Sequence, residues 1–426
     1  MVRQLYNRWQ RAIMLFATCV TINTLTAQSA AERVAEAINR SDIVWLESNH
    51  QQLKDSLPAH LSLMAEALYC SQLNRYNQSN RAIENLLNNH AQTIGESVAG
   101  GFYALLIDNL NRAGNFTEAA RLVAGSSMNR EAHRFFTAMS RKKPMQVRRP
   151  KRDVTVPFSL SKLSNGSHIH IPVEIDGKMA SFIFDTGAAK YNVVTESCAA
   201  RHKFTPLYDS LPTMGVGGEG YSRVVTIPKI KIGKITIKHP TFIVVPDESI
   251  PADSLGGFRL EYVLGTDCME ALGEVVFDMD KDSMTVPSIT TPKGEKSTPL
   301  THSNNYYIYP TVNGRQISMQ FDTGAVATHL YGRFMREFRE VLTLIGEPKS
   351  TRARGFGGTT YYTVQCAQKI DITMGNKSIT LNNVDVSTAD HDLPIQKEEY
   401  GSLGTDALLK CKRVRINFKQ MFVDVQ

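Results

Sequence analysis

The stretch Phe184-Asp185-Thr186-Gly187-Ala188 recurs 137 residues later as Phe321-Asp322-Thr323-Gly324-Ala325. In both places the aspartate directly follows an apolar run, where an ionised side chain would be costly if it were simply buried. Thr and Gly suit a tight turn with hydrogen bonds of its own. The two stretches therefore predict two copies of one unit, in which an apolar strand ends in a turn that presents a carboxylate.

Three further markers recur in the same order around these stretches. A glycine stands eight residues before each aspartate, at Gly177 and Gly314. A glycine cluster and then a Leu-Gly-Thr-Asp run follow each aspartate at nearly constant offsets: Gly215-Val216-Gly217-Gly218 and Gly355-Phe356-Gly357-Gly358, then Leu264-Gly265-Thr266-Asp267 and Leu403-Gly404-Thr405-Asp406. The common order predicts an internal duplication with a period of about 137 residues.

Alternating apolar and polar residues from near His168 onward predict that both copies consist mainly of strands. We assign the copies to residues 158–295 and 296–426. If they pack about a pseudo-twofold axis, the two turns meet and bring Asp185 and Asp322 together. Two carboxylates a few ångströms apart cannot both ionise, so the pair would share one proton. Such a dyad activates water with no metal and no covalent intermediate.

These motifs closely resemble those of the aspartic peptidases, above all the retropepsin-like group, and the resemblance spans both copies. It implies a mainly β fold in which two retropepsin-like β-barrel lobes form a single-chain pseudodimer. It also implies that Asp185 and Asp322 are the catalytic aspartates of an endopeptidase, which needs no cofactor and cleaves a polypeptide substrate. The alternative is a catalytically weak, peptidase-like module that binds a protein or peptide, but the intact motifs in both copies argue against such decay.

The resemblance further implies roles for the residues beside the aspartates. Thr186 and Thr323 would brace the two turns, and Gly187 and Gly324 would supply backbone amides near the carboxylates. The strands expected beneath the turns have an apolar-apolar-glycine pattern, from which the second copy departs at its first residue: Val263-Leu264-Gly265 and Ser402-Leu403-Gly404.

The glycine clusters admit two kinds of site. Residues 215–220 fit the GxGxxG pattern of dinucleotide binding, but that pattern needs a helix after it, and the residues that follow alternate as a strand. A mobile β-hairpin flap over a cleft explains both clusters, with a purely structural hairpin as the alternative. Each cluster is followed by a tyrosine, Tyr221 or Tyr361, which either lines the cleft or packs against its neighbours as an aromatic residue of a strand. The expected flap and substrate-binding residues are Gly215, Gly217, Gly218, Tyr221, Gly355, Gly357, Gly358 and Tyr361.

An export signal is predicted at the N-terminus. Three arginines precede the apolar stretch 12–22, and small and polar residues follow it, so we expect residues 1–27 to be removed as a signal peptide. No other stretch is apolar over the length that a membrane-spanning helix needs, which predicts an exported chain, periplasmic or secreted. A lipid anchor at Cys19 is the minority alternative, because the residues before it form a poor lipidation box.

Residues 28–140 have a helix-forming composition, with apolar residues spaced three and four apart. Two stretches, 73–77 and 110–116, echo each other 37 residues apart, and Ala82 and Ala119 follow them in similar places. This resembles tetratricopeptide helical hairpins, whereas an unrelated small helical bundle is an equal alternative. If this region has a function of its own, we expect it to bind a protein partner.

The net charge of +7 arises almost entirely from residues 141–153, which carry seven basic side chains and one acidic one. The rest is near neutral and has no basic-aromatic patch, so nucleic acid is not an expected partner. Hydrophobic and charged contents of 42% and 21% exclude collagen-like, coiled-coil and polytopic membrane classes. Like charges and prolines predict an exposed linker over 141–157. A processing site that releases a propiece, residues 28–152, is the alternative.

No metal site is predicted. The five cysteines outside the predicted signal peptide include no CxxC spacing. His168 and His170 alternate on a predicted strand and could face one metal, but no third ligand stands nearby, so we expect exposed strand histidines.

Overall fold

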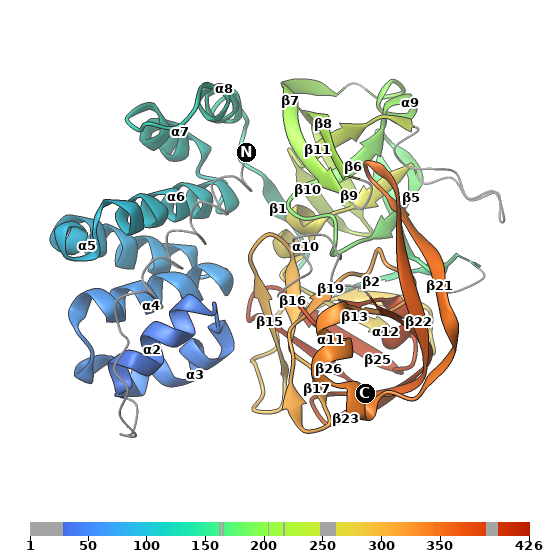
Figure 1. Cartoon of the computed structure of the whole chain (residues 1–426). Helices are drawn as coiled ribbons and strands as arrows, with labels where there is room; N and C mark the ends of the chain where they lie inside the picture. Colours follow the sequence, from blue (N-terminus) through green and yellow to red (C-terminus); the bar gives the residue numbers. More distant parts are fainter. Residues whose placement is uncertain are drawn as a thin grey trace. The chain divides into compact units, whose positions relative to one another are not determined.

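The computed structural model describes residues 29–161, 163, 166–202, 204–215, 218–247, 261–388 and 399–426, except for the side chains of 354 and 355. The signal peptide predicted over 1–27 and the candidate lipidation site Cys19 lie outside the described residues. The chain forms two compact units, which meet in sequence between Pro144 and Met145 (Figure 1). The first is helical and the second is built on two large β-sheets, which confirms the predicted fold class.

The first unit is a series of α-helices in which each packs against the next. Ser29 begins the series with a capping box: its hydroxyl accepts the Glu32 N–H, and the Glu32 carboxylate accepts the Ser29 N–H. The helices are α2 (Ala30–Asn39), α3 (Ile43–Leu53), α4 (Ala59–Gln72), α5 (Tyr76–Ile94), α6 (Glu96–Arg112), α7 (Phe116–Ala124) and α8 (Arg130–Met139).

The stretches that echo each other in sequence contain the turns between α4 and α5 and between α6 and α7, together with adjoining residues of these helices. Each turn contains a residue with left-handed backbone, Asn74 (φ 57°) or Gly114 (φ 75°). Ala82 and Ala119 are both buried in the helix that follows, where a small side chain lets the helices of a hairpin approach closely. The unit therefore contains two successive helical hairpins; their assignment as tetratricopeptide repeats remains a prediction.

The first sheet of the second unit is built mainly from the first copy. Its strand β4 (Ile169–Ile175) buries one face through alternate residues, as a half-exposed strand does. Neighbours pair in the order β1-β10-β9-β4-β5-β12-β6-β11-β8-β7, with β3 against β4. The other strands are β1 (Gln146–Arg148), β3 (Ser159–Leu160), β5 (Lys178–Phe184), β6 (Asn192–Thr195), β7 (Thr205–Gly215), β8 (Gly218–Thr226), β9 (Lys229–Ile232), β10 (Ile235–Lys238), β11 (Thr241–Val245) and β12 (Tyr262–Leu264).

The second sheet contains the strands of the second copy, the last two strands of the first copy and β2, which precedes the first copy. Its order is β18-β17-β22-β23-β20-β24-β19-β16-β15-β26-β25-β13-β14-β2, with β21 against β22. Its strands are β2 (Val154–Pro157), β13 (Glu274–Asp278), β14 (Ser283–Val286), β15 (Thr298–His302), β16 (Tyr306–Ile308), β17 (Thr311–Val312), β18 (Arg315–Gln316), β19 (Met319–Phe321), β20 (His329–Leu330), β21 (Leu344–Gly355), β22 (Gly358–Met374), β23 (Lys377–Ser387), β24 (Gly401–Leu403), β25 (Arg413–Asn417) and β26 (Phe422–Val425).

Strands β13 and β25, one from each copy, pair antiparallel and join the two lobes. Their register places Val276 directly opposite Arg415. Both residues stand 12 positions after the leucine of their copy's Leu-Gly-Thr-Asp run, so they are equivalent positions. When equivalent residues of two copies lie directly opposite each other in neighbouring antiparallel strands, a twofold axis passes through the sheet between them. The internal duplication predicted from the motifs is therefore expressed as pseudo-twofold symmetry.

Part of the segment predicted as an exposed linker, 141–157, belongs to these sheets. Strand β1 pairs with β10, and β2 pairs with β14. Val154 and Val156 are buried, and they alternate with exposed residues after the last basic side chain of the run. The prediction of an exposed linker is wrong for β2, because this short apolar alternation outweighs the charge that precedes it, whereas β1 lies within the basic run and has no buried residue.

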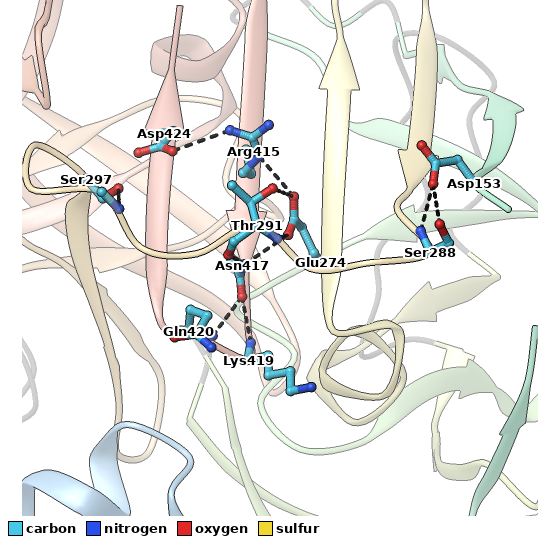
Figure 2. A network of polar contacts seen from close by, with 11 residues as sticks. Asp153, Glu274, Ser288, Thr291, Ser297, Arg415, Asn417, Lys419, Gln420 and Asp424 are labelled. Atoms are coloured by element: carbon cyan, nitrogen blue, oxygen red, sulfur yellow. Dashed lines mark hydrogen bonds and ion pairs between the residues drawn. The ribbon is translucent and has the colours of Figure 1, made fainter. Parts of the chain in front are cut away.

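A buried polar cluster lies where the lobes join (Figure 2). The carboxylate of Glu274 in β13 is fully buried and accepts hydrogen bonds from Arg415 Nε and Asn417 Nδ2 in β25, both at 2.9 Å. It also accepts the Thr291 N–H at 2.6 Å and the Thr291 hydroxyl at 2.9 Å. One carboxylate of the first copy thus ties together the strand of the second copy and the segment that connects the copies.

Candidate active site

Asp185 and Asp322 stand directly after the paired, buried ends of β5 and β19. Phe184 lies opposite Leu264 of the parallel strand β12, and Phe321 lies opposite Leu403 of the parallel strand β24. The Asp185 N–H donates to the Leu264 carbonyl at 3.2 Å, and the Asp322 N–H donates to the Leu403 carbonyl at 3.1 Å. Each Leu-Gly strand therefore supports one aspartate turn.

The departure at Ser402 leaves this support intact. Ser402 lies opposite Gln320 in β19, in the same way that Val263 lies opposite Ile183 in β5. It is buried between β19 and β20, because its backbone also pairs with His329. The ladder depends on backbone groups, so a small polar side chain suffices at this position.

The two turns meet, as the sequence predicts. A Cβ atom built on Gly187 would overlap the Asp322 carboxylate, and one built on Gly324 would overlap the Asp185 carboxylate. Each glycine thus lies directly against the aspartate of the opposite copy, at a distance that no other residue permits. The structure brings both carboxyl groups together at the junction of the lobes.

The threonines cross-link the two turns through four hydrogen bonds. Thr186 N donates to Thr323 Oγ1 at 3.0 Å, and Thr323 N donates to Thr186 Oγ1 at 2.9 Å. Each hydroxyl in turn donates to the carbonyl before the opposite aspartate, Thr186 to Phe321 at 2.6 Å and Thr323 to Phe184 at 2.7 Å. Both threonines are fully buried. This reciprocal arrangement fixes the separation of the carboxyl groups.

Backbone amides hold each carboxylate within its own turn. Gly187 N and Ala188 N donate to Asp185 Oδ1 at 2.7 and 3.2 Å, and Gly324 N and Ala325 N donate to Asp322 Oδ1 at 2.9 and 3.1 Å. The amide role implied for Gly187 and Gly324 thus has its geometric counterpart, and the oxygen Oδ2 of each aspartate is left for the partner carboxyl group or a bound molecule.

The pKa of both carboxyl groups is raised. Burial, and then the charge of Asp322, raise the pKa of Asp185 well above its usual value. Burial also raises the pKa of Asp322, but hydrogen bonds from Gly324, Ala325 and Asp185 oppose the rise. Two buried carboxyl groups this close share a proton, and their titration belongs to the pair rather than to either residue alone.

Both glycine clusters lie at the turns of long hairpins, β7–β8 and β21–β22. Gly215 pairs with Gly218, and Gly355 pairs with Gly358. The hairpin β21–β22 extends away from the body of the second lobe towards the first (Figure 1). Its tip meets the other hairpin, since Gly215 packs directly against the backbone of Phe356. Two hairpins thus contact each other at their tips.

The structure does not pack the two tyrosines into the lobes. Tyr221 and Tyr361 stand at equivalent places on β8 and β22, and each side chain is 68% exposed. Gly218, Gly357 and Gly358 have positive φ, as tight hairpin turns require. Gly217 lies outside the described residues. The assignment of these residues to a substrate-binding flap remains a prediction.

His168 and His170 differ from their sequence-based interpretation as exposed strand histidines. His170 is buried in β4, where its Nδ1 lies 3.0 Å from Ser181 Oγ and burial lowers its pKa to about 4. His168 is half-buried, and its Nε2 lies 3.0 Å from the carbonyl oxygen of Gly324 in the turn of Asp322. No local pattern signals this contact, because its partners are 156 residues apart.

Other features of the described residues add no second site. No group of three or more His, Cys, Asp and Glu side chains within them is arranged to hold a metal ion. The cysteines at 70, 198, 268, 366 and 411 form no disulfide. Within the same described part of the chain, no helix combines the length and the apolarity needed to cross a membrane.

Comparison with known proteins concerns the second unit. No curated protein matches the chain. Solved structures with similarity include an aspartic proteinase from Irpex lacteus (13% identity, 64% of this chain and 96% of that chain covered, TM-score 0.39). Similarity also extends to a retropepsin-like aspartic protease from Rickettsia conorii (18% identity, 33% of this chain and 91% of that chain covered, TM-score 0.21). A third similar structure is conglutin gamma, a basic 7S globulin from lupine seeds (11% identity, 65% of this chain and 95% of that chain covered, TM-score 0.38). Residues 171–267, which lie in the first lobe and include Asp185, match the family model described as aspartyl protease.

Proposed function

We propose that this protein is an aspartic endopeptidase whose catalytic groups are Asp185 and Asp322. The observation that carries the proposal is the meeting of two identical Asp-Thr-Gly turns across a pseudo-twofold axis. A structural ion pair would need no such symmetry.

In the proposed mechanism Asp185, whose pKa is raised by burial and by the charge of Asp322, is the protonated member of the dyad. Ionised Asp322 is the base that takes a proton from a water held between the carboxyl groups, while protonated Asp185 donates its proton to the scissile carbonyl oxygen. The water oxygen bonds to the carbonyl carbon and forms a tetrahedral diol. The diol then returns a hydroxyl proton to Asp185, Asp322 gives its proton to the amide nitrogen, and the carbon–nitrogen bond breaks.

An extended polypeptide is the substrate class that fits the hairpins. Strands β8 and β22 carry exposed tyrosines and backbone that an extended chain could pair with, and aromatic surface provides apolar contact for side chains of the substrate. Export of the chain and recruitment of a protein partner by residues 28–140 complete the proposal.

Cleavage of a peptide library by the full chain, from about pH 3 to 8, tests the proposal. Asp185→Asn and Asp322→Asn should each abolish cleavage, because each removes one proton carrier. Asp280→Asn is the matched control, since Asp280 is exposed in the turn between β13 and β14. Cleavage that survives either dyad substitution contradicts the proposed mechanism. A parent chain that binds peptides without cleaving them would identify the protein as a peptidase-like binding module.

A further inference from the structure

His168 of the first lobe contacts the aspartate turn of the second. Its Nε2 lies 3.0 Å from the Gly324 carbonyl oxygen. A carbonyl oxygen only accepts, so Nε2 carries a proton and donates it. That carbonyl belongs to the peptide group whose N–H, on Ala325, lies 3.1 Å from Asp322 Oδ1 and 3.2 Å from the Asp322 carbonyl oxygen. A single peptide group therefore links the imidazole to the carboxylate of Asp322.

The segment that carries His168 is fixed against this turn. Ser161 holds the backbone of His168 through two hydrogen bonds: its Oγ accepts the His168 N–H at 2.8 Å, and its own N–H donates to the His168 carbonyl at 3.1 Å. Thr405 bridges the two segments: its hydroxyl donates to the Ser167 carbonyl at 2.7 Å, and its N–H donates to the Ala325 carbonyl at 2.9 Å. The backbone on both sides of the His168 side chain is thus held in place.

The turn of Asp185 is built differently. Its glycine carbonyl, on Gly187, accepts the backbone N–H of Ala189 at 2.9 Å. The position equivalent to His168 is Asn305, which stands 137 residues later, the offset that relates the two aspartates. The symmetry of the threonines and amides is therefore broken at this one carbonyl, which receives an imidazole in the second turn only.

We propose that His168 is a positioning residue that makes Asp322 the ionised member of the dyad. A hydrogen bond donated to the Gly324 carbonyl polarises the peptide group and makes the Ala325 N–H a stronger donor, which favours the charged form of Asp322. The Asp185 proton is then the one available to the substrate carbonyl. Of the titratable groups, His170 lies close to the imidazole, with its ring centroid 6.4 Å away, and Asp322 is linked to it through the peptide group between Gly324 and Ala325.

The turn amides act on both aspartates, since the Ala188 N–H opposes the rise in the pKa of Asp185 as the Ala325 N–H does for Asp322, so the His168 contact is what distinguishes the two turns. The donor from Ala325 is among the hydrogen bonds that oppose the rise in the pKa of Asp322. The expected change in kcat rests on the proposed peptidase function. The expected change in the lower pKa of the dyad does not, because it can be measured without a substrate.

The test compares His168→Leu, which removes the donor, with His168→Gln, whose terminal amide can reach the same carbonyl. Asn305→Leu is the matched control at the equivalent position. His168→Leu should raise the lower pKa of the kcat/KM profile by about 0.5 to 1 unit and reduce kcat about tenfold, with little change in KM. His168→Gln should restore most of both, and Asn305→Leu should follow the parent.

Titration of the full chain carrying carboxyl-13C aspartate gives the lower pKa of the dyad without any substrate, and Asp185→Asn and Asp322→Asn assign the signals. An unchanged lower pKa in His168→Leu, or an equal rise in His168→Gln, overturns the proposal. If the parent cleaves no peptide, the peptidase function fails, but the titration still decides the role of His168. Should His168→Leu fail to fold, His168→Asn, whose amide is one bond too short to reach, takes its place.

Discussion

Replacing Glu274 by Gln removes one buried negative charge from the sheet that joins the lobes, with almost no change in side-chain volume. Each carboxylate oxygen of Glu274 accepts two hydrogen bonds: Oε1 from Arg415 Nε and the Thr291 hydroxyl, and Oε2 from Thr291 N and Asn417 Nδ2. The Gln amide has one acceptor and one donor end, so its NH2 group must face one of these two pairs of donors.

Neither orientation satisfies all the donors. The Thr291 hydroxyl can rotate and become an acceptor, but Arg415 Nε and Thr291 N cannot. The Asn417 amide cannot turn over either, because its Oδ1 already accepts the N–H groups of Lys419 at 3.0 Å and Gln420 at 2.7 Å. At least one buried donor therefore loses its acceptor, whichever way the new amide points.

The expected loss of stability is about 2 to 4 kcal/mol. A buried donor left without an acceptor costs about 1 to 3 kcal/mol, and removal of one partner of a buried ion pair costs about 3 to 5 kcal/mol. The lower part of the second range applies, because the Arg415 side chain is 21% exposed and keeps a contact with Asp424 at 3.5 Å. Asp424→Asn, which weakens only that contact, should cost less than about 0.5 kcal/mol.

Urea unfolding at neutral pH, followed in the transition of the unit 145–426, measures the difference between the parent, Glu274→Gln and Asp424→Asn. A second arm combines Glu274→Gln with Arg415→Met, and the pair should show a coupling energy of about 1 to 3 kcal/mol. Loss of less than about 0.5 kcal/mol in Glu274→Gln, or additive effects in the double variant, would refute the reasoning that this carboxylate holds the lobes together.

Three further predictions concern the dyad and its surroundings. Thr186→Val should cost about 2 to 4 kcal/mol in urea unfolding, because it leaves the Phe321 carbonyl and the Thr323 N–H buried without partners, whereas Thr186→Ser should stay near the parent. Folding raises the pKa of Asp185, so the contribution of this group to stability falls as pH rises above its pKa in the unfolded chain, about 4. Asp185→Asn should therefore have a higher melting temperature than the parent at neutral pH. This difference in melting temperature should shrink towards acid pH. The pKa of His170 shifts in the opposite direction, to about 4, so stability is lost as pH falls from about 6.5 to 4. His170→Gln should therefore reduce the fall of the melting temperature over this pH range. An unchanged fall in the variant would contradict the lowered pKa of His170.

The fold and the dyad could be predicted from sequence because their signals repeat. Asp185 and Asp322 each follow an apolar strand, and the Leu-Gly-Thr-Asp runs recur at nearly the same offset, so one copy explains the other. The meeting of the turns follows from the duplication, since two copies of one unit bury their common surface most simply about a twofold axis.

The features that the sequence did not reveal depend on contacts between distant segments. Strand β2 has only Val154 and Val156 to mark it, directly after a strongly basic run, and its partner β14 lies about 130 residues further along. His168 carries no signal of its own, because its role depends on which carbonyl the fold places opposite it. The meeting of Gly215 with Phe356 likewise arises from two hairpins that have no shared pattern beyond their glycines.

The pairing of Val276 with Arg415 limits how the two halves could exist apart. These residues face each other on the axis, where directly opposed Cα atoms lie about 4.5 to 5.5 Å apart. A self-paired second half would place two guanidinium groups against each other there, and it would offer no Glu274 to neutralise them. A self-paired first half would bury two Glu274 carboxylates without an arginine. The duplicated halves are complementary rather than interchangeable, so we expect neither half alone to form a homodimer through this sheet.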